Sequence, residues 1–140
     1  MDLPSQKFIK DIAVGMTAEY EKQVTDQDVR SFAEVSGDFN PIHLDEEFAK
    51  GTMFGQRIAH GILTASHISA TLGYIFPGPG WIYLNQNLQF RAPVMIGDVV
   101  KTLVEVTDVN SEKYTIVMTT NCFVGDKLVL KGEAIMKSPD

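Results

Sequence analysis

The sequence contains a single cysteine, Cys122. One cysteine cannot form a disulfide within the chain, which excludes a disulfide-stapled scaffold and favours a reducing compartment. No run of 18 apolar residues occurs, and the first residues lack a basic stretch followed by an apolar one. We therefore expect no membrane span and no signal peptide, and the expected location is the cytoplasm.

Clusters of lysine and arginine are absent as well, and the formal net charge is −6. Nucleic acids and anionic membranes are bound by surfaces of dense positive charge, so neither is expected as a partner. Hydrophobic residues make up 44% and charged residues 21% of the 140 residues, close to globular averages, which excludes disorder. We expect residues 1–140 to form one domain with its own core.

Two helices and several strands are expected. Residues 26–36 carry apolar side chains at helical spacing, with Thr25 in the N-cap position, and residues 46–50 can add a further turn. Residues 61–76 contain no charged residue, which is typical of a helix buried on every side, and small side chains would let a sheet pack closely against it. Residues 16–24 have mixed strand character, and Pro77-Gly78-Pro79-Gly80 ends the long helix.

Beyond residue 80 the apolar period changes to two. Alternation over residues 82–90, 100–106, 116–124 and 128–136 predicts four strands, with hairpin connections at residues 109–113 and 125–126. A long helix followed by an antiparallel meander predicts an α+β domain whose sheet curls around the helix, the architecture of the hot-dog fold. A sheet this short has exposed edges, and pairing of two copies covers them, so we expect a homodimer.

One turn, Ser36-Gly37-Asp38-Phe39-Asn40-Pro41-Ile42-His43, places a carboxylate close to an imidazole. In a continuous helix, Asp38 and His43 would lie roughly 140° apart around the axis. Pro41 prevents this, because it lacks an N–H and pushes Asn40 towards extended geometry, so the preceding helix should stop near Gly37. The turn then directs both side chains into one cleft, and the sequence predicts an acid/base site.

This turn, with Phe32 upstream and Ala49 six residues after the histidine, resembles the signature of the MaoC-like (R)-specific enoyl-CoA hydratases. The resemblance covers about residues 16–137 and includes two further segments, Ile58-Ala59-His60-Gly61 and Phe90-Arg91-Ala92-Pro93-Val94. It implies reversible addition of water to a trans-2-enoyl-CoA thioester, giving an (R)-3-hydroxyacyl-CoA, without a cofactor.

The resemblance also implies roles for particular residues. Asp38 and His43 form the catalytic pair, one activating water and the other orienting it, and the two roles are interchangeable at this level. The N–H of Gly61, in the first turn of the long helix, binds the thioester oxygen as it gains negative charge. Asn40 shapes the loop and bonds across it, while Ser69 and Leu72 line the acyl pocket.

Simpler interpretations stand beside these. Alone, Asp38 is a turn former and His43 a surface residue. Asp38, His43 and Asp45 are possible metal ligands, but no further histidine or cysteine completes a set, so no metal is expected. We expect a structural role for His60 before the N-terminus of the long helix, and the alternative is a contact with the pantetheine arm of the substrate.

Arg57, Arg91 and Lys101 are either neutralising groups for coenzyme A phosphates or solvated charges. The rival functions are a dehydratase acting on acyl carrier protein, a hot-dog thioesterase and a non-catalytic acyl-CoA-binding module.

Overall fold

A single antiparallel sheet dominates the computed structural model, which describes residues 3–140. Its five strands lie in the order β1-β3-β4-β5-β2. Their bounds are β1 Thr17–Gln23, β2 Ile82–Phe90, β3 Val99–Asn110, β4 Thr115–Val124 and β5 Lys127–Lys137. The four alternating segments and the segment of mixed strand character are thus confirmed as strands. The predicted hairpin at Gly125-Asp126 is also present, since Val124 pairs with Lys127 across it.

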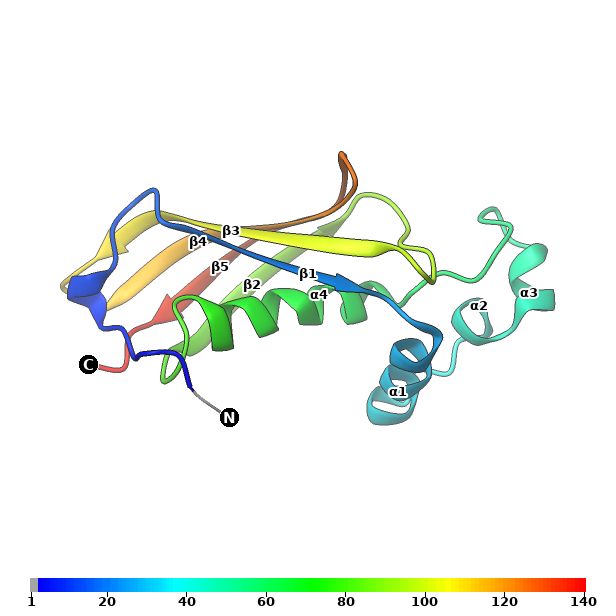
Figure 1. The fold of residues 1–140 in the computed structure, drawn as a ribbon, viewed down its shortest axis with the longest axis horizontal. Helices are drawn as coiled ribbons and strands as arrows, with labels where there is room; N and C mark the ends of the chain where they lie inside the picture. The colour runs from blue at the N-terminus through cyan, green and yellow to red at the C-terminus, as the bar shows by residue number, and fades with distance from the viewer. Residues whose placement is uncertain (1–2) are drawn as a thin grey trace.

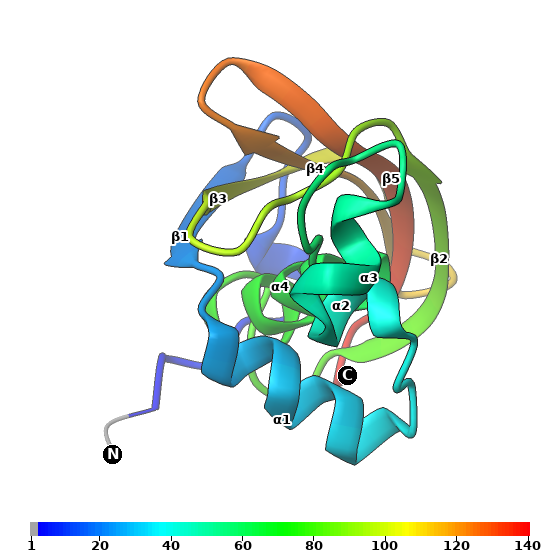
Figure 2. The ribbon, with the colours of Figure 1, turned by 90° about the vertical axis from the view of Figure 1, so that its right-hand side faces the viewer.

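The sheet curls over one long helix, α4 Gly61–Ala70, which lies along its concave side (Figures 1 and 2). Leu63, His67 and Ile68 point into the core beneath the sheet, and all three are buried. This confirms the predicted α+β class and its hot-dog arrangement. Among the described residues, no helix has both the length and the apolar character needed to cross a membrane.

The opposite face of α4 is exposed, so the prediction of a helix buried on every side is wrong for the single chain. Ile62 is 55% exposed, and Ser66 and Ser69 are exposed with it. The sheet covers only one side of the helix, and the small residues that were expected to face the sheet lie on the other side. The absence of charge therefore marks a face left open by this chain's own sheet.

The long helix also ends differently from the prediction, because residues 71–75 form a π-helical turn, η2 Thr71–Ile75. The N–H of Phe76 reaches back five residues to the carbonyl of Thr71, at 2.9 Å. The Thr71 hydroxyl donates to the carbonyl of His67 at 2.7 Å, a bond that loosens regular helix geometry. Gly73 lies in the same turn, and glycine has a low intrinsic preference for the α-helix, so it does little to keep the helix regular here.

Three helices lie between β1 and α4 and project beyond one end of the sheet (Figure 1). They are α1 Asp26–Ser36, α2 Pro41–Leu44 and α3 Glu46–Lys50, and we call residues 26–50 the helical lobe. A 3-10 turn, η1 Ile9–Asp11, precedes β1. The Thr25 hydroxyl accepts from the Asp28 N–H at 3.1 Å, and the Asp28 carboxylate accepts from the Thr25 N–H at 3.0 Å. The predicted start of α1 is confirmed as a capping box.

Candidate active site

The site begins where α1 ends. Gly37 has φ +82°, a left-handed conformation that ends a helix and that glycine adopts without steric cost. The chain then turns sharply, and the N–H of Asp38 donates to the Ser36 hydroxyl at 3.1 Å. The helix stop predicted near Gly37 is confirmed, and it places Asp38 in the turn that follows α1.

Two side chains in the turn bond to the backbone two residues ahead. The Asp38 Oδ1 accepts from the Asn40 N–H at 3.1 Å, and the Asn40 Oδ1 accepts from the Ile42 N–H at 3.1 Å. Asn40 is thereby the N-cap of α2, and Pro41 occupies the first helical position, where no N–H is needed. These bonds set the spacing between Asp38 and the single turn of helix that carries His43.

The His43 side chain is held in one tautomer. Its Nδ1 lies 2.7 Å from the carbonyl oxygen of Ile58. A carbonyl only accepts hydrogen bonds, so Nδ1 carries the proton and Nε2 keeps its lone pair in the neutral ring. His43 is 8% exposed. The free nitrogen is therefore a proton acceptor in a largely desolvated position.

Burial lowers the pKa of His43 below its ordinary value of 6.5. The Ile58 carbonyl and the Asp38 carboxylate oppose this effect, whereas His60 adds to it, and the net direction is downward. A neutral imidazole results near pH 7, which is the form that can take a proton from water.

His60 closes the site from the side of α4. It is 2% exposed, and its ring lies against His43 with centroids 3.9 Å apart and planes at 31°. The Phe32 ring also lies against the His60 ring, with centroids 4.7 Å apart. The His60 Nε2 donates to the backbone carbonyl of Asp38 at 3.1 Å, while its Nδ1 has no hydrogen-bond partner in residues 3–140. His60 thus touches both halves of the acid/base turn.

Three potential ligand atoms converge here, one each from Asp38, His43 and His60, and all lie within 4.8 Å of one another. Two hydrogen bonds of about 2.8 Å span more than this separation, so one water can bind two of these groups together. His60 is a further histidine of the kind whose absence from the predicted set argued against a metal, and it takes the place of Asp45 in the observed cluster. Two imidazoles and one carboxylate are residue types that divalent metals accept, and the expectation of no metal stays a prediction.

A cavity of about 510 Å³ opens beside His43. Its walls are mainly apolar and come from the segment before α4, from α4 itself, and from β2, β5 and the loop after β2. They include Phe54, Ile58, Gly61, Ile62, Thr64, Phe90, Arg91, Pro93, Val94, Val129 and Leu130. A cavity of this kind accommodates an acyl chain better than a charged ligand.

Gly61 lies at the wall of this cavity as the first residue of α4. Its N–H has no carbonyl partner within the helix, and the helix dipole favours negative charge at this end. A Cβ on Gly61 would lie 2.6 Å from Cε1 of Phe90, so the absence of a side chain allows the two elements to approach closely.

Comparison with known proteins decides the family. The family model described as a MaoC like domain matches residues 8–126. The chain belongs to the MaoC-like domain family. It is 50% identical over 132 residues to the 3-hydroxybutyryl-CoA dehydratase of Methylorubrum extorquens, covering 94% of this chain and 84% of that one. It is 44% identical over 129 residues to the (R)-specific enoyl-CoA hydratase of Aeromonas caviae, covering 91% and 96%.

Two solved structures of R-hydratases agree with these matches. The unliganded R-hydratase PhaJ1 of Pseudomonas aeruginosa superposes with a TM-score of 0.90 at 42% identity, covering 95% of this chain and 86% of that chain. The (R)-hydratase of Aeromonas caviae also gives 0.90, at 44% identity, covering 93% and 99%.

The structure of this MaoC-like chain brings some of the predicted site residues together and separates others. Asp38, His43 and Gly61 lie around the cavity or directly beside it. Asn40 is exposed and caps α2. Ser69 lies on the exposed face of α4 in an open groove against β2, and Leu72 is fully buried in the core.

Two residues make contacts in the structure that were not predicted from the sequence, His60 and Arg57. His60 contacts the turn that carries Asp38 and His43, and its position immediately before the helix that starts at Gly61 was the available signal. Arg57 was expected to be a phosphate ligand or a solvated charge, but its side chain is only 9% exposed and is paired with Asp26. Its ion-pair partner lies 31 residues away in the chain, which no local pattern reveals.

Proposed function

We propose that this protein catalyses the reversible hydration of trans-2-enoyl-CoA to (R)-3-hydroxyacyl-CoA. The observation that carries the proposal is the convergence of Asp38 and His43 within 4.8 Å, beside an apolar cavity. The relatives at 44–50% identity are named for this chemistry or its reverse. The proposal extends their reaction to this chain.

Water is the nucleophile in the proposed reaction, and the Asp38 and His43 side chains bind it together. One O–H bond of the water breaks as its oxygen bonds to C3 of the substrate, and the released proton passes to Asp38 or His43. C2 then receives a proton from the same pair, so that one water is consumed and the enzyme returns to its starting state. His43 is suited to accept the proton near neutral pH, because it presents an unprotonated Nε2.

The thioester oxygen gains negative charge when the nucleophile adds to C3. In this proposal the Gly61 N–H donates to this oxygen, and its position as the first residue of α4 supports the assignment, because the positive end of the helix dipole adds to the stabilisation. In this proposal Asn40 supports the reaction indirectly, by fixing the turn. Ser69 contacts the acyl chain only if the groove along α4 joins the cavity, whereas Leu72 is fully buried and lines neither the groove nor the cavity.

The test is an assay with crotonyl-CoA, a four-carbon enoyl thioester. We expect loss of the enoyl ultraviolet absorbance without release of free thiol, and a product that an (R)-specific 3-hydroxyacyl-CoA dehydrogenase oxidises. Thiol release would instead indicate a thioesterase, and binding without either change a non-catalytic module. Either outcome would refute the proposal.

Coenzyme A is the proposed carrier, in preference to acyl carrier protein. The relatives named for CoA substrates are 44–50% identical to this chain, whereas a mitochondrial acyl-carrier-protein dehydratase of Arabidopsis thaliana is 34% identical. Parallel assays with crotonyl-CoA and crotonyl-acyl carrier protein test this choice. A higher kcat/KM on the carrier protein would overturn it.

We further propose that the protein is a homodimer joined along β2. In the described sheet β2 pairs with β5 on one side, and its other edge is open. Ile82 and Leu84 on β2 are 56% and 52% exposed, and an open groove of about 500 Å³ runs between β2 and the small-residue face of α4. A second copy related by a two-fold axis would cover this apolar edge.

Sedimentation velocity tests the dimer. We expect the wild-type chain to sediment as a dimer and Leu84→Glu as a monomer, because a charge on the open edge opposes pairing. Val35→Glu is the matched control, since Val35 is 85% exposed on α1 and away from β2. A dimer that persists in Leu84→Glu would refute the β2 interface.

A cytoplasmic location completes the proposal. It is supported by Cys122, which is a free, buried thiol whose pKa is raised by burial. Cell fractionation with an antibody to the protein tests it, and recovery with secreted proteins would contradict it.

A further inference from the structure

His43 lies on a helix too short to hold its own shape. α2 has four residues, a single turn, and an isolated turn of helix is unstable in water. The position of the His43 ring must therefore come from contacts outside α2: the His60 ring packs against it, and the hydrogen bonds come from two adjacent residues, Arg57 and Ile58.

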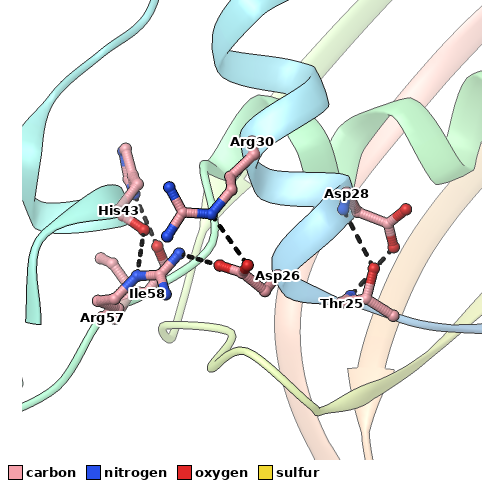
Figure 3. Close-up of polar contacts among 7 residues, drawn as sticks. All are labelled: Thr25, Asp26, Asp28, Arg30, His43, Arg57 and Ile58. Carbon is pink, nitrogen blue, oxygen red and sulfur yellow. Dashed lines mark hydrogen bonds and ion pairs between the residues drawn. The ribbon is translucent and has the colours of Figure 1, made fainter.

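Residues 57 and 58 bind α2 at three points. The Ile58 carbonyl accepts from the His43 ring at 2.7 Å, and the Ile58 N–H donates to the carbonyl of Ile42 at 3.3 Å. The Arg57 Nε–H donates to the backbone carbonyl of His43 at 2.7 Å (Figure 3). The ring and the backbone of His43 are thus held by adjacent residues of one segment.

Arg57 is in turn anchored to α1. Its guanidinium lies 2.7 Å from Oδ1 of Asp26, a residue in the first turn of that helix, and the side chain is 9% exposed (Figure 3). The same carboxylate binds Nε of Arg30 through its other oxygen, at 2.9 Å. Arg57 therefore bridges the N-terminal turn of α1 and the end of α2.

The chemistry of this bridge requires a guanidinium. Its donors lie in one plane at fixed angles, so one N–H can bind a carbonyl while another binds a carboxylate. A lysine at the same position has a single nitrogen and cannot occupy both places. Because the Arg57 charge is largely desolvated, loss of either acceptor is costly, and this keeps the guanidinium in place.

We propose that Arg57 is a positioning residue for His43. Fixed on Asp26, it holds the end of α2 so that the His43 Nδ1 stays on the Ile58 carbonyl and Nε2 faces the reacting water. The inference rests on the proposed hydration, in which His43 takes part, and it assigns Arg57 no contact with the substrate.

Arg57→Met and Arg30→Met form the matched test pair. Each removes one arginine from the Asp26 carboxylate, but only Arg57→Met removes the donor to the His43 carbonyl. We expect kcat for crotonyl-CoA hydration to fall about ten-fold in Arg57→Met with KM changed by less than about two-fold. In Arg30→Met both constants should stay within about two-fold of the wild type.

Nitrogen-15 NMR of the histidine rings supplies a readout independent of activity. In the wild-type protein the His43 signals should report a protonated Nδ1 and an unprotonated Nε2 at pH 7.5. In Arg57→Met we expect a mixture of tautomers, and in Arg30→Met the wild-type pattern. A folded Arg57→Met protein with the wild-type tautomer and kcat would overturn the proposal.

Arg57→Lys keeps the positive charge and the ion pair with Asp26, so it remains informative even if Arg57→Met does not fold. We expect Arg57→Lys to lose at least about three-fold in kcat and to show a mixed tautomer, since one nitrogen cannot replace both donors. Wild-type behaviour of Arg57→Lys in both measurements would also overturn the proposal. If the wild-type protein has no hydratase activity, the proposed function fails, while the tautomer measurement still tests the contact itself.

Discussion

Removal of either member of the proposed catalytic pair, Asp38 and His43, gives the sharpest test of the proposed chemistry. The substitutions are Asp38→Asn and His43→Gln, which keep the size of each side chain and remove its ability to accept a proton. General base catalysis contributes about 10²- to 10⁴-fold, so each variant should lose at least about 10²-fold in kcat. The possible ligand atoms of Asp38 and His43 lie within 4.8 Å of each other, and in the proposed mechanism both bind one water, so the double variant should lose little more than the worse single variant.

The assay is a double-mutant cycle. Initial rates with crotonyl-CoA are measured for the wild type, both single variants and the double variant. Circular dichroism establishes that each protein is folded. Asp45→Asn serves as control, since Asp45 follows the same turn but its side chain caps α3 through the Phe48 N–H at 3.1 Å. Near-wild-type kcat in either single variant, or losses that multiply in the double variant, would refute the shared-water mechanism.

Three further predictions concern pH and two glycines. Burial lowers the pKa of His43 and His67 below 6.5, so the unfolded chain takes up protons first as the pH falls. The unfolding free energy from urea titrations should therefore decrease between about pH 7.5 and 5.5, and an increase would contradict the assignment. Gly61→Ala should lower kcat/KM about ten-fold with little change in Tm, because the new Cβ displaces the half-exposed Phe90 ring at the cavity wall. Gly132→Ala should lower the unfolding free energy by about 1–3 kcal/mol, since its Cβ would lie 2.5 Å from a backbone oxygen of β2. An unchanged unfolding free energy in urea would contradict this, because β5 and β2 would then have moved apart to accommodate the methyl group without loss of stability.

Much of the fold follows from local patterns. The helix at residues 26–36 was predictable because Thr25, Asp28 and Gly37 carry its start and end signals within a few residues of one another. The strands after residue 80 were predictable because one face of each meets the core, which imposes a period of two. The acid/base turn was predictable because its signals are also local: Pro41 and Asn40 fix the backbone of the residues directly beside them.

The rest depends on contacts between distant segments. Ser69 was expected to line the acyl pocket, but in the structure it lies on the face of α4 that the sheet leaves open. An uncharged helix looks the same in sequence whether its own sheet or another surface covers it. The contact of His60 with Asp38 spans 22 residues, and that of Arg57 with Asp26 spans 31. Such pairs become visible only when the tertiary structure brings them together.

The helical lobe, residues 26–50, has a consequence for how activity is lost on heating. It projects beyond the sheet, and of its residues Val29 belongs to the buried core cluster, with Phe32 and Leu44 packed against it. The five strands, by contrast, are joined in one continuous ladder. Segments with few buried apolar contacts open at lower free-energy cost than the core, so the lobe should detach while the sheet is intact. Thermal inactivation of this protein then reports the opening of the lobe, and the sheet remains as a template on which the active site reforms on cooling.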